Sequence, residues 1–244
     1  MTAIEAQNLV KTYVSGHFWN RKKTTALCGI NLKIKEKQVF GLLGLNGAGK
    51  TTFIKTLVGL VFPTSGKVSI LGKAAGHTEI RKDIAYLPEM PYFPRYLTPE
   101  EILLFYARLY ELPAGSRKEK VFAALNEVGL FEKKKVQLKE FSKGMLQRVG
   151  IAQLLLNDAR VFFLDEPTYG LDPLSAKQMR DIILSLKKAG KTIFLNTHQM
   201  GEIKQICDRI GILNNGRLID EVEVKKITGS LETYFIRKVL ADGK

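Results

Sequence analysis

The chain has 244 residues, of which 45% are hydrophobic and 25% are charged, so it can bury a large core and is not a disordered polypeptide. No run approaches the roughly 18 apolar residues of a membrane span, and the first residues do not have the pattern of a signal peptide. The net charge of +14 favours a partner with negative charge, such as a nucleotide, an anionic membrane surface or nucleic acid.

The first part of the chain is predicted to form a small antiparallel sheet. Apolar and polar residues alternate over 30–35, which is the period of a half-buried strand. Residues 15–25 are expected to be a polar, basic loop that contains Phe18 and Trp19. Tyr13 precedes this loop, and on its own an aromatic residue there is more often a packing residue than a binding residue.

Residues 44–52 read Gly-Leu-Asn-Gly-Ala-Gly-Lys-Thr-Thr, the spacing of a phosphate-binding loop, between an apolar run and apolar residues at helical spacing from Phe53 to Leu60. Glycines allow a tight turn that directs backbone N–H groups at phosphate oxygens, and a helix N-terminus adds attraction. Lys50 would reach the β- and γ-phosphates, and the Thr51 hydroxyl would bind Mg²⁺. The loop residues expected to contact the nucleotide are Asn46, Gly47, Gly49, Lys50, Thr51 and Thr52. The protein is therefore predicted to bind a nucleoside triphosphate.

The segment from about residue 88 to 158 is predicted to be almost entirely helical, as an insertion in an α/β core. Thr98 is expected to cap a helix that begins with a proline, with Glu101 completing a capping box. This helix should run to about Leu112, and a second helix should stop at Gly129.

Later in the chain, a continuous apolar run over 161–164 is typical of a parallel strand buried on both faces. Asp165 ends this strand, where a carboxylate can support Mg²⁺, and Glu166 follows, where a carboxylate can orient or deprotonate an attacking water. His198 follows a second predicted strand at 192–196, at the sheet edge where open α/β proteins bind ligands.

Ser142 is predicted to be the N-cap of a helix with an early glycine, Gly144. The exposed N–H groups of such a helix start make it a second possible phosphate site. Near the end of the chain, two short strands are expected around the turn at 214–216. The tail from Glu223 is weakly patterned, with a short amphipathic helix suggested by its apolar residues near Leu231.

These motifs together resemble the ATP-binding subunit of ABC transporters, over roughly residues 4–220. Residues 44–52 are similar to the Walker A motif of that family, 161–166 to Walker B with its catalytic glutamate, and 142–145 to its signature motif. Residues 170–172 are similar to the D-loop, His198 to the H-switch, and Tyr13 to the aromatic residue that stacks on adenine.

The resemblance implies an α/β fold with a P-loop NTPase (RecA-like) core, a small antiparallel β subdomain and an inserted α-helical subdomain. A single ABC ATPase domain is expected over 1–222, with its core at about 1–87 and 159–222 and its helical subdomain at about 88–158. Residues 223–244 are expected to be a C-terminal tail.

Two positions depart from the family pattern. Lys143 stands in the signature motif where a glycine is usual, a variation found in the exporter branch. Glu89 stands where the family usually has the glutamine of the Q-loop. Its carboxylate can still be an oxygen ligand for Mg²⁺, but it adds negative charge beside the triphosphate.

By resemblance, the functional form is a head-to-tail homodimer that encloses two ATP molecules with Mg²⁺, Ser142 and Gly144 of one copy facing the P-loop of the other. Lys50 and His198 would neutralise charge on the γ-phosphate, and Glu166 would act on the water. The chain would be a peripheral protein on the cytoplasmic side of the cell membrane that powers a transmembrane permease of an ABC-2-type exporter. Residues 90–96, rich in aromatic side chains, would contact the permease, or would equally well pack within the helical subdomain.

Two other classes are weighed against this one. A soluble ABC ATPase acting on nucleic acid or ribosomes is suggested by the charge of +14, but such proteins usually have tandem cassettes or long coiled coils, and no nucleic acid is expected here. A P-loop kinase or GTPase would leave the helix that begins after Ser142 without a purpose.

The short basic clusters, such as 133–135, lack interleaved aromatic residues, which favours solvated faces near a membrane. Cys28 and Cys207 are expected to be reduced packing residues of a cytosolic protein.

Overall fold

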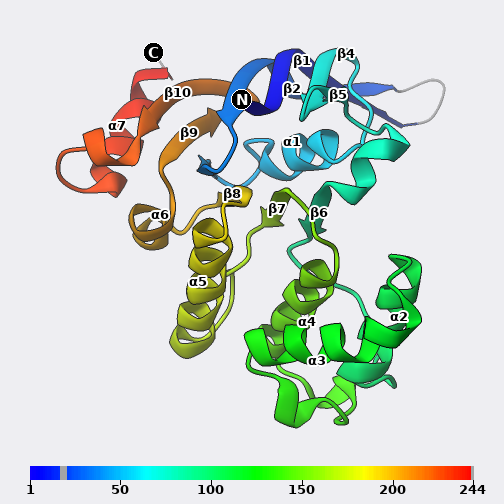
Figure 1. Ribbon diagram of the computed structural model, residues 1–244. Helices are drawn as coiled ribbons and strands as arrows, with labels where there is room; N and C mark the ends of the chain where they lie inside the picture. Colours follow the sequence, from blue (N-terminus) through cyan, green and yellow to red (C-terminus); the bar gives the residue numbers. More distant parts are fainter. Residues whose placement is uncertain (17–20, 243–244) are drawn as a thin grey trace.

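The computed structural model describes residues 1–16 and 21–242, which form two β-sheets, an intervening helix and a separate group of helices (Figure 1). This arrangement confirms the predicted α/β class with a P-loop core, an antiparallel sheet and an inserted helical part. The helices α2, α3 and α4 all lie between strands β6 and β7 in the sequence.

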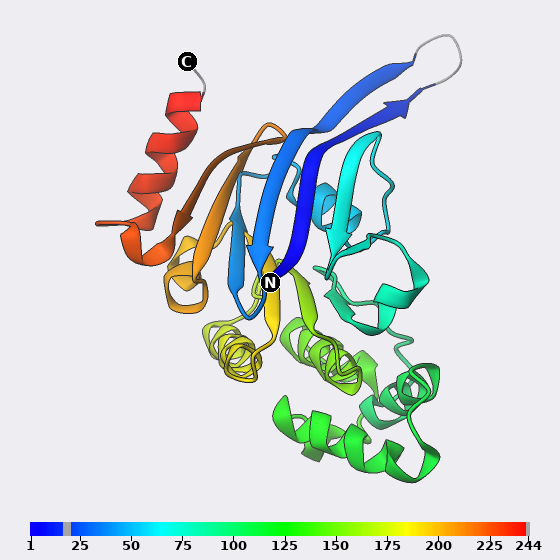
Figure 2. The same ribbon diagram turned by 45° about the horizontal axis from the view of Figure 1, so that its top comes forward.

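The antiparallel sheet has the strand order β2-β1-β4-β5, made of β1 (Thr2–Ser15), β2 (Lys22–Lys35), β4 (Ser65–Ile70) and β5 (Lys73–Ala74). β1 and β2 pair from Thr2↔Lys35 to Ser15↔Lys22, and their hairpin projects beyond the rest of the sheet (Figure 2). The predicted loop at 15–25 is therefore wrong in extent, because residues 22–25 belong to β2. The outer parts of the two strands are solvated on both faces, so the sequence there has no alternation of apolar and polar residues. Phe18 and Trp19 lie outside the described residues.

The six-stranded sheet has the order β10-β9-β3-β8-β7-β6. Its strands are β3 (Val39–Leu43), β6 (Ile84–Leu87), β7 (Val161–Asp165), β8 (Thr192–Thr197), β9 (Arg209–Asn214) and β10 (Arg217–Glu223). The strands from β9 to β6 run parallel, and β10 pairs with β9 antiparallel. The turn predicted between β9 and β10 is present, with positive φ at Asn215 and Gly216. Every residue of β3, β7 and β8 is buried, which explains their continuous apolar runs.

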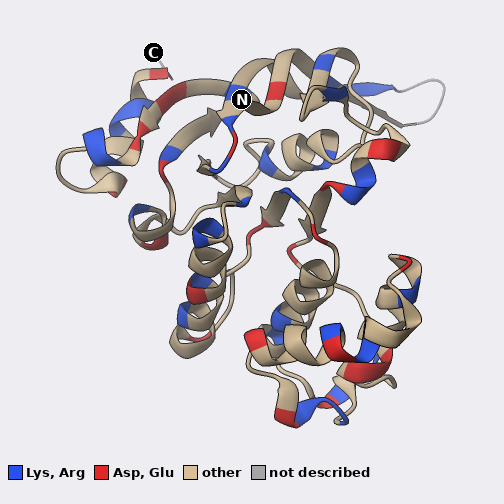
Figure 3. Ribbon diagram, viewed as in Figure 1, with Lys and Arg blue, Asp and Glu red and all other residues tan. Residues whose placement is uncertain are grey.

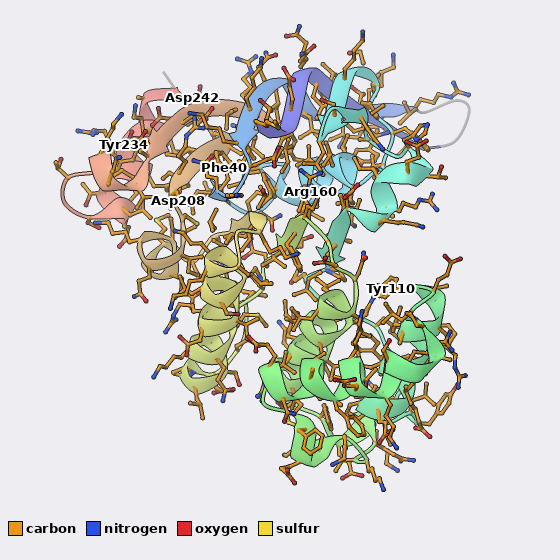
Figure 4. All side chains as sticks on the ribbon, in the orientation of Figure 1. Phe40, Tyr110, Arg160, Asp208, Tyr234 and Asp242 are labelled. Carbon is orange, nitrogen blue, oxygen red and sulfur yellow. The ribbon has the colours of Figure 1, made fainter. Side chains whose placement is uncertain are left out.

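Two hydrophobic cores cover the faces of this sheet. On one face, Phe40 and Leu42 of β3 pack with α1 (Lys50–Leu57) and the antiparallel sheet (Figure 4 labels Phe40). On the other face, Val39 and Leu43 contact the core formed by α4 (Lys143–Leu156), α5 (Pro173–Lys188) and α6 (Met200–Ile206). The helix α1 is shorter than the predicted one because Gly59, with φ +77°, ends it, and Leu60 is exposed.

The helical part consists of α2 (Pro99–Leu109), α3 (Arg117–Glu127) and α4. The predicted capping box is confirmed: the Glu101 N–H donates to Thr98 Oγ1, and the Thr98 N–H donates to Glu101 Oε2. α2 ends at Leu109, earlier than the expected Leu112, because the chain turns at Glu111, where φ is +57°. Short 3₁₀ turns occupy Thr78–Lys82, Ala114–Ser116, Phe131–Lys133, Leu138–Glu140 and Val224–Lys226.

The predicted amphipathic helix near the C-terminus is present as α7 (Leu231–Asp242). Its buried residues Leu231 and Phe235 join the core shared with α4, α5 and α6. The Tyr234 hydroxyl donates to Asp220 Oδ2 of β10 at 2.6 Å, and Figure 4 labels this tyrosine on α7. Burial and the Asp220 carboxylate raise the pKa of Tyr234 to about 12. The helix is therefore attached to the sheet by both apolar and polar contacts.

Candidate functional site

A cavity of about 400 Å³ lies at the carboxyl ends of the parallel strands. The P-loop follows β3, Glu166 follows β7, and His198 follows β8, so the parallel arrangement brings them to one edge of the sheet. Glu89 follows β6 and also lines this cavity. The described lining residues are Ala26, Leu45, Asn46, Gly47, Gly49, Lys50, Thr51, Thr52, Glu89, Glu166, Tyr169 and His198.

The P-loop has the geometry that its glycines predict. Gly47 and Gly49 have φ of +82° and +106°, which a residue with a side chain rarely adopts. A Cβ on Gly49 would also lie 2.5 Å from the Ala26 carbonyl oxygen of β2. Lys50 is the first residue of α1, and its Nζ donates to the Gly44 carbonyl oxygen at 2.8 Å. The loop is thus closed on itself around the lysine, at a helix N-terminus that attracts anions.

Glu166 occupies the centre of the polar contacts in the cavity. Its Oε1 lies 3.0 Å from Nδ1 of His198 and 3.6 Å from Nζ of Lys50. Its backbone has φ +48°, and its N–H donates to Oδ1 of Asn196 at 3.0 Å, so Asn196 holds this strained residue in place. Sequence reasoning assigned no role to Asn196, although a polar residue inside an apolar strand was a signal.

Asp165 is buried and is not among the described residues that line the cavity. Among the described side chains, two hydroxyls approach its carboxylate: Thr51 Oγ1 and Tyr86 Oη, each at 3.5 Å. Burial, with the negative charges of Glu166 and Glu89, raises the pKa of Asp165. Tyr86 was not predicted as a site residue, because its position in the strand before Glu89 gives no sign that it reaches β7.

These oxygen donors suit Mg²⁺, because a hydroxyl and a carboxylate are its usual protein ligands beside substrate phosphates. A buried carboxylate that two hydroxyls approach at only 3.5 Å also favours a cation. Within the described ranges, no group of three or more His, Cys, Asp or Glu side chains could hold a metal ion. The Thr51 hydroxyl and the Asp165 carboxylate would suit an ion that is also bound by phosphate oxygens.

Ser142 and Gly144 are not among the residues that line the cavity. Ser142 caps α4, with its Oγ accepting the Met145 N–H at 3.3 Å, as predicted. Gly144 packs against the start of α5, where a Cβ would lie 2.7 Å from Ser175 Oγ. The start of α4 is therefore not part of the described lining of the cavity that contains the P-loop of the same chain.

Tyr13 lies on β1 opposite Thr24 and is 40% exposed. It is not among the described lining residues, although Ala26, two residues further along β2, is. The Lys11 ammonium lies 5.0 Å from the centre of the Tyr13 ring. Its contact with adenine stays a prediction.

The side chains of residues 90–96 were expected either to contact a partner or to pack within the helical part, and the structure has both exposed and buried members. Met90, Tyr92 and Tyr96 are exposed, with Tyr92 at 89%. Phe93 instead is buried against Tyr106 of α2, with ring centroids 6.4 Å apart. One aromatic residue therefore anchors the segment while the others face outward.

Comparison with known proteins identifies the family. The family described as "ABC transporter" matches residues 27–169. An uncharacterized ABC transporter ATP-binding protein of Nostoc is 45% identical over 97% of this chain and 71% of its own length. The bacitracin transport ATP-binding protein of Bacillus licheniformis is 38% identical over 91% of this chain and 70% of its own length. A solved dimeric ATP-binding cassette with bound ADP and phosphate, in a post-hydrolysis state, superposes with a TM-score of 0.82 at 25% identity, covering 92% of this chain and all of that one.

The chain belongs to the ABC transporter family. It is an ATP-binding subunit of a transporter and an ATPase, and subunits of this kind dimerise and work with transmembrane partners. Among the described residues, no helix is long and apolar enough to cross a bilayer.

Proposed function

We propose that this chain is the ATPase of an exporter, that it hydrolyses Mg²⁺-ATP as a homodimer, and that it lies on the cytoplasmic face of the membrane against a permease. The contact of one Glu166 oxygen with both His198 and Lys50 carries the proposal. A carboxylate, an imidazole and an ammonium then converge at the place where a phosphate bound to the P-loop would lie. The relationship to a bacitracin transport protein supports the export direction.

The residues divide the chemistry among them. Lys50 and the P-loop N–H groups hold the β- and γ-phosphates, and His198 contacts the γ-phosphate. Glu166 orients the water that attacks the γ-phosphorus and accepts its proton as the bond to ADP breaks. Mg²⁺ held by Thr51, Asp165 and Glu89 would supply positive charge to the phosphate oxygens. Tyr13 stacks on the adenine.

The dimer follows from the position of Ser142 and Gly144. The start of α4, which Ser142 caps, is not among the described residues that line the cavity of its own chain. In a head-to-tail pair this helix start meets the γ-phosphate bound to Lys50 of the other copy. The similar cassette that is dimeric with ADP and phosphate supports this pairing.

The permease contacts the exposed apolar side chains beside the cavity. Met90, Tyr92 and Tyr96 are exposed, and Phe105 and Leu109 of the following helix α2 are also more than half exposed. A concentration of exposed apolar side chains in one part of the chain favours a protein partner. The segment is connected to the site because Gln147 of α4 donates a hydrogen bond to the carbonyl oxygen of Glu89, next to Met90.

The nucleic-acid alternative receives no comparable support. Lys and Arg residues are spread over the sheets and the helices and are interspersed with acidic residues (Figure 3). A nucleic-acid interface needs a basic stripe that follows the phosphates. The net charge is better explained by a position near an anionic membrane surface.

The test of the proposed function is the Glu166→Gln variant, which keeps the size of the side chain and removes its basicity. We expect ATP binding to persist while turnover falls by about 10²- to 10⁴-fold, the usual contribution of a general base. The variant should also accumulate as an ATP-bound dimer, measured by light scattering after size-exclusion chromatography. Glu79→Gln, at an exposed ion pair with Lys73, is the matched control. Near-wild-type turnover in Glu166→Gln would remove this residue from the role of base.

A further inference from the structure

Tyr169 connects two parts of the chain that the proposed mechanism treats separately. It follows Glu166 by three residues, its N–H donates to the Glu166 carbonyl oxygen at 3.1 Å, and its ring lines the nucleotide cavity. The Tyr169 ring packs edge-on against the His198 imidazole, with centroids 5.0 Å apart and an interplanar angle of 64°. His198 is thus held between an aromatic ring and the Glu166 carboxylate.

The Tyr169 ring is also contacted by Lys143, the first residue of α4. Its Nζ lies 4.7 Å from the centre of the ring, within the range of a cation–π contact. The Lys143 side chain also lies close to Gly170, the residue after Tyr169, since a Cβ on Gly170 would lie 2.9 Å from Lys143 Nζ. Lys143 replaces a glycine in the pattern that the sequence resembles, so the residue that departs from that pattern is the one that contacts Tyr169.

These contacts form a continuous path within one chain. Lys143 contacts Tyr169, Tyr169 contacts His198, and His198 Nδ1 lies 3.0 Å from Glu166 Oε1. The packing beneath the path is close, because Gly144 meets Ser175 where α4 and α5 begin. Because this packing leaves little free space, a displacement of the α4 start would also displace the Tyr169 ring.

We propose that Tyr169 is a positioning residue for ATP hydrolysis, which holds His198 against Glu166 and is itself held by Lys143. This proposal rests on the proposed roles of Glu166 and His198. The aromatic ring restricts the rotation of the imidazole, and the ammonium fixes the ring. The turnover at one nucleotide site thereby depends on the position of α4 of the same chain. This dependence is additional to any contact that α4 makes with a second copy.

The first experiment separates positioning from binding. Tyr169→Ala should lower kcat on the order of tenfold, because a small misplacement of catalytic groups is costly, while the KM for ATP and the Kd of a fluorescent ATP analogue change little. Tyr169→Phe keeps the ring and should retain most of kcat. Tyr169→Leu, which keeps volume without a π-face, should resemble Tyr169→Ala and replaces it if the alanine variant folds poorly. A rise in KM or Kd that accounts for the loss, or a Phe variant as slow as Ala, would overturn the proposal.

The second experiment tests the contact with Lys143. Lys143→Ala should lower kcat by about 2- to 5-fold, as expected for a partly exposed cation–π contact, and Lys143→Arg should restore it. In the Tyr169→Ala background, Lys143→Ala should have no further effect, since the contact is already lost. Lys118→Ala is the matched control, because Lys118 lies 5.5 Å over the Phe122 ring, away from the site. Fully additive effects of the two alanine substitutions would overturn the link between Lys143 and Tyr169.

The two proposals fail in different ways. If Glu166→Gln abolishes turnover and Tyr169→Ala does not change it, the proposed function holds and the positioning role is wrong. If Glu166→Gln turns over normally, the assignment of the base is wrong, whatever Tyr169→Ala does.

Discussion

The ammonium of Lys50 and the carboxylate of Glu166 form a buried ion pair, with Nζ 3.6 Å from Oε1. The same lysine donates to two carbonyl oxygens of the P-loop, those of Gly44 and Leu45. The cation that is expected to bind phosphate is thus paired with the group that is expected to act on water. When a triphosphate binds, Lys50 would pair with the phosphate instead of Glu166. Glu166 would then keep only its contact with His198 among these two partners.

Lys50→Ala should weaken ATP binding by about 10- to 150-fold, because hydrogen bonds to a charged group contribute about 1.5–3 kcal/mol. The Kd of a fluorescent ATP analogue measures the loss. Lys67→Ala, at an exposed position on β4, is the control for removing a positive charge. Unchanged affinity of Lys50→Ala would contradict the assignment of residues 44–52 as the phosphate-binding loop.

Tyr13→Ala should weaken ATP binding by about 1–3 kcal/mol if the ring stacks on adenine, and Tyr13→Trp should bind about as well as the wild type. The ring is 40% exposed, and the Lys11 ammonium lies 5.0 Å from its centre. Binding of ATP and of inorganic triphosphate should be compared, since the base contact affects the first alone. If Trp19→Ala loses affinity and Tyr13→Ala does not, Trp19 is the stacking residue instead.

Glu89→Gln should change basal hydrolysis only modestly, because the carboxylate would both hold Mg²⁺ and repel the γ-phosphate. The larger change is expected in stimulation by the permease, since Glu89 lines the cavity and adjoins exposed Met90. ATPase activity against Mg²⁺ concentration, with and without the permease, measures both effects. Identical curves for wild type and variant, with and without the permease, would exclude a role of Glu89 in Mg²⁺ binding and in coupling to the permease.

Thr98→Ala should destabilise the protein by about 1 kcal/mol, the usual cost of a lost N-cap. Equilibrium unfolding in urea measures this change. A difference below a few tenths of a kcal/mol would show that the capping box of α2 contributes little in this context.

The capping box also predicts a pH dependence. The backbone N–H and the hydroxyl of Thr98 donate to Glu101 and hold its pKa below the usual value. A depressed folded-state pKa contributes stability that is present above the unfolded pKa and is lost as pH falls through the folded one. The stability difference between wild type and Glu101→Gln should therefore shrink as the pH is lowered below about 4. A constant difference down to acidic pH would exclude this linkage.

The parts of the site that lie in one short segment could be predicted from the sequence. The P-loop, Asp165 with Glu166, and the start of α4 each combine a residue pattern with a local structure, and the expected helix or strand is present at each of them, while the roles of these residues stay predictions. Glu89, which was singled out only by the resemblance to the family's Q-loop, also lines the cavity, because it follows β6 at the same edge of the sheet.

The residues that were missed reach the site through tertiary contacts. Ala26 arrives from the β1–β2 hairpin, and Tyr169 from a loop that turns back on Glu166. Neither residue type signals a function. The extent of this hairpin was also missed, because its solvated outer strands have no buried face to produce a pattern.

Ser142 and Gly144 lie outside the cavity that contains Lys50. If a second copy completes each cavity, turnover per chain should rise with protein concentration and be nearly absent in dilute solution. Two copies bound to one permease would instead face each other at an effective concentration of the order of millimolar. ATP would then be consumed at assembled transporters, and unassembled subunits elsewhere in the cell would stay idle without any inhibitor.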